Sequence, residues 1–169
     1  SHYPDSVVVV GAGFIACEFA CILRGLGLSV TVVVRGERLL RGFDQELADA
    51  VLEGMRDSGI HVQFGVTVQS IQGEPGDLRV DLSDGLTIPC GGVLMATGRR
   101  PWLDGLGLEA AGVQVQDGRI PVDADQRTNV PHVFAVGDVT DRVNLTPVAI
   151  DEGRAFADAV YGGRPRQVD

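Results

Sequence analysis

The sequence predicts an α/β fold, in which a doubly wound parallel sheet carries helices on one face and a three-stranded antiparallel meander on the other. Apolar, β-branched runs at 6–13 and 29–34 flank a segment with helical spacing at 14–26, and such a strand–helix–strand unit is typical of parallel sheets. The segment 66–90 alternates apolar and polar residues between turn residues, as antiparallel strands do. Together these patterns predict a three-layer ββα arrangement.

The later elements follow from the same patterns. A second amphipathic helix is expected over 43–59 with Asp44 as its N-cap, because a short acceptor side chain precedes the apolar spacing. Short apolar segments at 60–65 and 92–98 have the composition of further buried strands. We expect the second helix to pack through four apolar side chains: Leu47, Val51, Leu52 and Met55.

The character of the chain changes after GRRP at 98–101, which predicts a domain boundary near 98–102. Residues 102–132 are rich in glycine, aspartate and proline and predict little regular structure. VFAVGD at 133–138 predicts another buried strand. A last helix is expected over 146–162, with Thr146 as its N-cap and Pro147 at its first position.

Composition excludes some classes of partner. The 169 residues carry a formal charge of −9, which argues against nucleic acid or an anionic membrane. Three cysteines, an odd number, favour a reducing, cytoplasmic compartment over a disulfide scaffold. Cys17 and Cys21 lie four residues apart on one helix, where packing is the expected role and a redox pair is the alternative. The abrupt first strand and the closing GGRPRQVD predict a piece of a longer protein.

The glycine-rich stretch GAGFIA at 11–16 predicts a Rossmann-like dinucleotide site, because it follows a strand and opens a helix. Gly11 would permit the tight turn, and Gly13 would let the backbone approach a pyrophosphate. Ala16 would pack the helix against the strand. The helix N-terminus would offer its free N–H groups to the phosphates. The alternative is a plain tight turn without a nucleotide.

The stretch VVVRGERLLR at 32–41 bears on which nucleotide would bind. An acidic residue at the end of the second strand accepts hydrogen bonds from the ribose of NAD, whereas arginine accommodates the 2′-phosphate of NADP. This strand ends in Val34 followed by Arg35, so we expect Arg35 and Arg41 to hold a 2′-phosphate. Arg38 is expected to be solvated. The alternative is three solvated surface arginines.

Five motifs stand in the same order as in a known family: GAGFIACEFA, VRGERLLRGFD, ATGRRP, VFAVGDV and NLTPVAI. On these residues the chain resembles the FAD-dependent pyridine nucleotide–disulfide oxidoreductases over nearly its whole length. RGFD and LTPVAI resemble the glutathione reductase branch in particular. The trypanothione, dihydrolipoamide and mercuric ion branches remain alternatives. Phe14 stands where a tyrosine is usual, and phenylalanine there also occurs in the trypanothione branch.

The resemblance implies that residues 1–101 form an NADPH-binding domain and that 102–169 are a central segment that completes an FAD domain. Arg35 and Arg41 would hold the 2′-phosphate, and Glu18 would face the flavin and pair with a lysine. Asp138 would bond the FAD ribityl chain, and Thr146 would open the helix that faces the flavin pyrimidine edge. The other residues that the resemblance places at the nucleotide are Gly11, Ala12, Gly13, Phe14, Ile15, Ala16, Gly98 and Arg99.

The resemblance also implies a reaction for the intact protein, which would be a homodimer. Hydride would pass from NADPH to FAD, and electrons would then pass to a disulfide and on to oxidised glutathione. No cysteine pair here has the C-x4-C spacing of the family, and His2, His61 and His132 match no catalytic motif. We therefore expect no catalytic residue and no metal ligand in this chain, and no glutathione reduction by it alone. A stand-alone nucleotide-binding module is the remaining alternative.

Overall fold

The computed structural model describes residues 4–168, which divide into two compact units, Ser1–Gly98 and Arg99–Asp169. Each unit has its own hydrophobic core. The units separate inside the stretch 98–102, where the composition changes.

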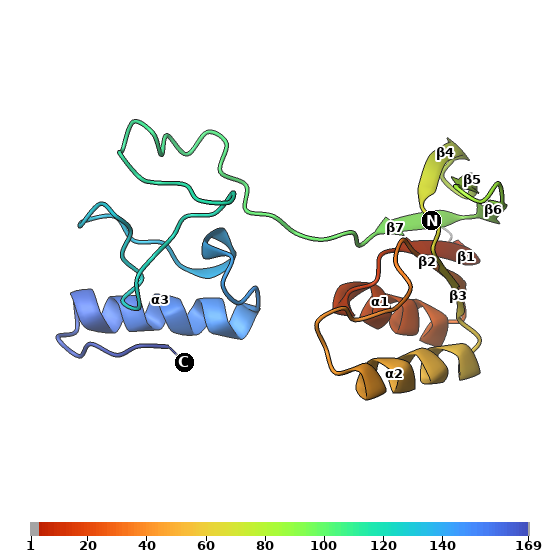
Figure 1. Cartoon of the computed structure of the whole chain (residues 1–169), viewed down its shortest axis with the longest axis horizontal. Coiled ribbons are helices and arrows are strands. Elements are labelled where there is room, and N and C mark those ends of the chain that lie inside the picture. Colours follow the sequence, from red (N-terminus) through yellow and green to blue (C-terminus); the bar gives the residue numbers. More distant parts are fainter. Residues whose placement is uncertain (1–3, 169) are drawn as a thin grey trace. The chain divides into compact units, whose positions relative to one another are not determined.

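A four-stranded parallel sheet forms the centre of the first unit (Figure 1). Its strands are β1 (Ser6–Val10), β2 (Ser29–Val34), β3 (His61–Phe64) and β7 (Gly92–Met95), in the spatial order β3-β2-β1-β7. The strands β1 and β2 consist largely of valine because both of their faces are buried. The predicted parallel sheet is therefore confirmed.

Two helices cover one face of this sheet, α1 (Phe14–Gly25) and α2 (Gln45–Asp57). Asp44 caps α2 as predicted, because its Oδ1 accepts hydrogen bonds from the backbone N–H groups of Glu46 at 3.0 Å and Leu47 at 3.2 Å. Gly27, at φ +93°, turns the chain just after α1.

The prediction of which α2 residues pack against the sheet was partly wrong. Leu47 is 67% exposed and Val51 is 38% exposed. The helix instead packs through Ala48, Leu52 and Met55, which share one helical face at spacings of four and three residues. The two misassigned residues each precede a member of that face by one position, which rotates them by about 100° away from the sheet.

The predicted meander covers the other face of the sheet, with strands β4 (Val68–Glu74), β5 (Asp77–Leu82) and β6 (Thr87–Cys90) in antiparallel order. Successive side chains of β1 point to opposite faces of the sheet, and both faces are buried. Val7 and Val9 face the helices, whereas Val8 packs with Val80 and other apolar residues of the meander. The three-layer arrangement is confirmed.

The second unit consists mostly of loops, with a single-turn 3-10 helix η1 (Gly137–Thr140) and the helix α3 (Thr146–Val160). The strand predicted over 133–138 was wrong. Phe134 forms only an isolated bridge with Arg127, and Gly137, at φ +72°, starts η1. Apolar β-branched residues favour an extended backbone here. A strand needs several consecutive hydrogen-bonded pairs, and in the part of the chain that the structure describes this stretch forms only one.

The start of α3 also differs from the prediction. Leu145 is the N-cap and makes no side-chain capping bond, while Thr146 is the first helical residue and Pro147 the second. Thr146 therefore does not cap the helix, and within residues 4–168 no side-chain capping bond is made at the start of α3. Among the described residues, no helix is both long and apolar enough to cross a membrane.

Candidate nucleotide site at the carboxyl edge of the parallel sheet

A cavity of about 520 Å³ lies where β1, β2 and β7 end. In open α/β sheets this edge is where ligands bind, because the strand-to-helix loops meet there. The cavity is lined by the glycine loop, the arginine-bearing loop after β2, the segment that enters β4 and the residues just after β7. Its polar lining includes Arg35, Arg38, Arg41, Thr67 and Thr97.

Gly11 is required by the backbone at this edge. Its φ is +148°, and a Cβ there would lie 2.2 Å from the carbonyl oxygen of Ala96. Ala96 cannot move away freely, because its N–H donates to the carbonyl of Val10 at 2.8 Å. Ala16 is fully buried and would be 3.4 Å from the same Cβ, so it packs helix against strand as predicted.

Gly13 leaves the N-terminus of α1 open. It is the N-cap, with no side-chain capping bond, and a Cβ built on it would meet nothing within 4 Å. The first turn of α1 also contains no acidic residue. The unpaired N–H groups and the positive end of the helix dipole are therefore available to an anion.

The arginine-bearing loop is fastened to the glycine loop. The N–H of Leu40 donates to the carbonyl of Ala12 at 2.7 Å, and the side chain of Leu39 is 1% exposed. Arg35 and Arg41 are exposed at the cavity, and within residues 4–168 neither forms an ion pair. Two cationic side chains are thus held beside an uncapped helix N-terminus.

Arg38 was expected to be solvated, and it is exposed but also lines the cavity. Its Nη1 lies 3.5 Å from Oε1 of Gln45, a weak contact with the start of α2. The sequence reasoning also missed Thr67 and Thr97. Thr97 could have been found from its place just after a strand that neighbours the glycine loop, whereas Thr67 carries no such signal.

The remaining predicted nucleotide residues divide into two groups. Ala12 and Gly98 line the cavity with the residues described above. Phe14, Ile15 and Glu18 lie on α1 and do not line it; Phe14 is 41% exposed. The structure therefore brings together the loop glycines, the two arginines and Gly98, but not the side chains of the first turns of α1.

Asp138 and Thr146, two of the three residues predicted at a flavin, lie in the second unit, whereas Glu18 lies on α1 in the first. Arg99 was predicted at the nucleotide, but it belongs to the second unit and does not line the cavity. Its Nη2 pairs with Oδ2 of Asp138 at 3.0 Å. The two side chains are 66% and 42% exposed, so this ion pair contributes no more than about 1 kcal/mol. Thr146 opens α3, whose first N–H groups have no side-chain acceptor. The second unit thus offers an exposed acid and a helix start without a capping side chain.

A second cavity, of about 490 Å³, lies between the edges of β3 and β6 and includes His61. It contains no helix N-terminus with free N–H groups and no glycine loop. His132 is exposed, and His2 lies outside the described residues. Within residues 4–168 no group of three His, Cys, Asp or Glu residues has metal-binding geometry.

The cysteines differ in their environment. Burial raises the pKa of the Cys17 thiol to about 11, and burial also raises the pKa of Cys90. Cys21 is exposed on α1. Packing therefore accounts for Cys17, as expected, but Cys21 points to solvent rather than into the core.

Alkylation of the native protein should therefore modify Cys21 first. The thiolate is the reactive form, and a thiol with a pKa of about 11 is almost wholly protonated at pH 8. Peptide mass mapping after a short iodoacetamide pulse should find label at Cys21, with Cys17 and Cys90 labelled only after denaturation. Equal labelling of Cys17 in the native protein would contradict its burial.

Comparison with known proteins gives a consistent picture. The family model described as pyridine nucleotide-disulphide oxidoreductase matches residues 1–153. Glutathione reductase of Burkholderia cepacia is 48% identical over 162 residues, which are 95% of this chain and 36% of that protein. Trypanothione reductase of Trypanosoma congolense is 40% identical over 171 residues, 98% of this chain and 35% of that protein. The chain thus spans little more than a third of these relatives.

Solved structures agree with the sequence relatives. The flavoprotein disulfide reductase RclA of Escherichia coli superimposes with a TM-score of 0.88 at 26% identity, over 98% of this chain and 38% of that one. LpdA of Mycobacterium tuberculosis gives a TM-score of 0.87 at 30% identity, over 99% of this chain and 37% of that one.

Proposed function

The chain belongs to the pyridine nucleotide-disulphide oxidoreductase family, and from that premise we propose that its first unit, with the boundary at 98–102, is the NADPH-binding domain of the protein. One observation carries the proposal. The uncapped N-terminus of α1 and the arginine-bearing loop, joined by the hydrogen bond from Leu40 N–H to the Ala12 carbonyl, line a single cavity at the carboxyl edge of the sheet. Diphosphate and 2′-phosphate are the anions that such a pair of cationic features would hold.

The proposed roles follow the geometry. The backbone of the loop from Gly11 to Gly13 would receive the pyrophosphate at the helix N-terminus, and Arg35 and Arg41 would hold the 2′-phosphate. Arg38 adds a third positive charge to the same cavity. Gly98 also lines the cavity, and Ile15 and Ala16 would contribute backbone N–H groups of the first turn of α1. Phe14 and Glu18 would act on the side of α1 outside the cavity.

The family is one of flavoproteins, and the second unit is proposed to contribute to the FAD site. Asp138 and the first turn of α3, beginning at Thr146, would bind the cofactor. When bound, FAD supplies the acceptor for hydride from the nicotinamide. The positive end of α3 would stabilise negative charge on the reduced flavin. Arg99, which pairs with Asp138, would help to set the position of that carboxylate.

The substrate of the intact protein is proposed to be glutathione disulfide, with a homodimer as the working form and the reducing cytoplasm as its compartment. The higher identity to a glutathione reductase than to a trypanothione reductase supports this choice. Steady-state oxidation of NADPH by the full-length protein, with glutathione disulfide, trypanothione disulfide and lipoamide as competing acceptors, tests it. Preference for either of the last two would contradict the proposal.

Replacing Gly13 by alanine should weaken NADPH binding without unfolding the protein. At φ −82° and ψ 176° alanine is accommodated, and its Cβ would meet nothing within 4 Å. The methyl group would instead stand between the helix N-terminus and the pyrophosphate, which should raise the Kd by about tenfold.

Isothermal titration with NADPH, together with thermal unfolding, measures both effects. The matched control is Gly25→Ala at the other end of α1, outside the cavity lining, where an added Cβ also meets nothing within 4 Å. Unchanged NADPH affinity in the Gly13→Ala variant would show that the nucleotide does not approach this helix end.

A further inference from the structure

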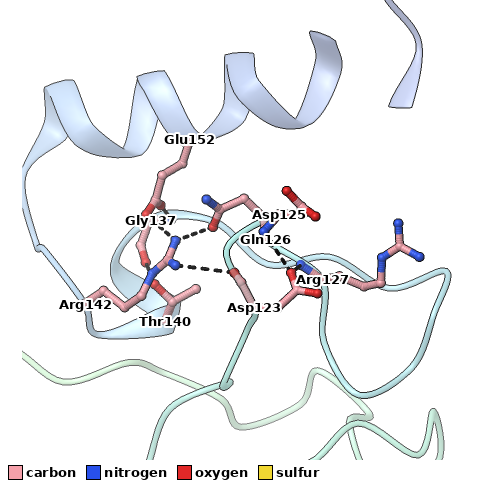
Figure 2. Close-up of polar contacts among 8 residues, drawn as sticks. All are labelled: Asp123, Asp125, Gln126, Arg127, Gly137, Thr140, Arg142 and Glu152. Atoms are coloured by element: carbon pink, nitrogen blue, oxygen red, sulfur yellow. Dashed lines mark hydrogen bonds and ion pairs between the residues drawn. The ribbon is translucent and has the colours of Figure 1, made fainter. Parts of the chain in front are cut away.

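A buried carboxylate lies beneath the proposed flavin-facing part of the second unit. Glu152, on α3, is 3% exposed, and each of its two oxygens has a different partner (Figure 2). Oε2 accepts a hydrogen bond from the backbone N–H of Gly137 at 2.6 Å, and Oε1 accepts one from Nη2 of Arg142 at 2.7 Å. Each carboxylate oxygen therefore has one donor from the protein.

Stability is a weak reason for this ion pair. Glu152 is buried while the Arg142 side chain is 34% exposed, so the cost of desolvating the carboxylate opposes an attraction that solvent partly screens. A well-packed apolar pair of similar volume is often as stable. The contacts of Glu152 are therefore better explained by the positions in which they hold the chain than by the stability that they add. They join α3 to two other segments of the second unit.

The first segment is η1, which begins at Gly137. A Cβ on Gly137 would lie 3.0 Å from the Cβ of Ala149, so η1 sits directly against α3. The hydroxyl of Thr140, itself 2% exposed, donates to the Gly137 carbonyl at 2.8 Å and closes the turn. Asp138 is the next residue along the chain, so the contact between Gly137 and Glu152 holds the backbone from which its side chain extends, while its carboxylate pairs with Arg99.

The second segment is the turn at 123–127, which Arg142 connects to Glu152. Besides Glu152, its guanidinium donates to Oε1 of Gln126 and lies 3.5 Å from the carbonyl oxygen of Asp123. Gln126 is 2% exposed and adopts φ +65°, which a non-glycine residue rarely does. Asp123 holds this turn, because its Oδ1 accepts the N–H groups of Asp125 and Arg127.

We propose that Glu152 and Arg142 are positioning residues for the flavin site, which hold the carboxylate of Asp138 and the first turn of α3 in one fixed relation. This inference rests on the proposed function, since it assumes that Asp138 and α3 contact FAD. Neither Glu152 nor Arg142 would touch the cofactor itself. They act through Gly137, which joins the buried carboxylate to the acid on the surface.

The test uses the full-length flavoprotein and the variant Glu152→Gln. Glutamine keeps the shape of the side chain but has one acceptor oxygen and one NH2 group, so it cannot accept from both the Gly137 N–H and Arg142. The Kd for FAD, measured by quenching of flavin fluorescence on addition to the apoprotein, should rise at least about tenfold. The midpoint potential of the bound flavin should also shift, while the Kd for NADPH stays within about twofold because its cavity is in the other unit.

The matched control is Asp158→Asn, which removes an acid on the same helix that pairs with Arg164 and Arg166 near the surface. Its FAD affinity and flavin potential should stay at wild-type values. If Glu152→Gln prevents folding, Arg142→Lys takes its place. Lysine keeps the charge but has one nitrogen in place of both the Nη2 that bonds Glu152 and Gln126 and the Nη1 that lies by the Asp123 carbonyl.

Two results would overturn the inference. One is wild-type FAD affinity in the Glu152→Gln or Arg142→Lys variant. The other is a lower thermal stability with an unmoved flavin potential, which would leave the pair a purely structural role. Failure of the proposed function is distinguishable, because the wild-type full-length protein itself would then bind no FAD.

Discussion

Replacing Arg35 and Arg41 together by alanine should raise the Kd for NADPH by about 100-fold and leave the Kd for NADH within about twofold. Each arginine would contribute charge-assisted hydrogen bonds to the 2′-phosphate, a group that NADH does not have. Both side chains are exposed at the cavity and have no carboxylate partner among the described residues. Their charge is therefore free to act on a ligand, although solvent and salt screen it.

Competition titrations with both nucleotides at two salt concentrations measure this effect. The difference between wild type and the double variant should shrink as salt is added, because exposed charges are screened. Arg79→Ala, on the exposed surface of the meander, is the matched control and should change neither affinity. An equal loss of NADPH and NADH binding in the double variant would show that the arginines do not discriminate the 2′-phosphate.

Replacing Gly11 by alanine should destabilise the first unit by about 3–5 kcal/mol. The backbone there has φ +148°, and the added Cβ would lie 2.2 Å from the Ala96 carbonyl oxygen. Neither side can give way, because the Gly11 N–H donates to the Val33 carbonyl and the Ala96 N–H donates to the Val10 carbonyl. The substitution would therefore push apart β1 and β7 next to the cavity.

Hydrogen exchange of the β1 and β2 amides reports the first unit separately from the second. Protection should collapse in Gly11→Ala. The control is Gly54→Ala, an exposed position inside α2 where a Cβ meets nothing within 4 Å. That change should raise stability by about 1 kcal/mol, because alanine is the better helix former. Wild-type protection in Gly11→Ala would contradict the close approach of the two strands.

The layered part of the fold could be predicted because its sequence signals are local. Valine runs buried on both faces identify parallel strands, and Asp44 identifies the start of α2. The residues through which α2 packs were harder to predict, because the small Ala48 rather than the larger Leu47 packs against the sheet. The stretch 133–138 has the composition of a strand, but whether a strand forms depends on its hydrogen-bond partners, which composition does not reveal.

The residues that line the cavity likewise differ in how well the sequence predicted them. Gly11, Gly13 and Arg35 could be placed at the cavity because each stands close to the end of a strand. Arg38 and Arg41 lie further along an irregular loop, whose path depends on the bond from Leu40 to Ala12, so the sequence, which predicted Arg41 but not Arg38 at the phosphate, did not reveal that both line the cavity. The contacts of Glu152 with Gly137 and Arg142 join residues ten and fifteen apart. No periodicity in the sequence marks such a set.

The central claim is that the first unit is built to bind NADPH, and paired calorimetric titrations of the wild-type protein with NADPH and NADH test it most directly. The uncapped helix N-terminus would serve both nucleotides, whereas the arginines would serve only the 2′-phosphate. NADPH should therefore bind at least about tenfold more tightly than NADH at low salt. Equal affinities, or tighter binding of NADH, would contradict the account.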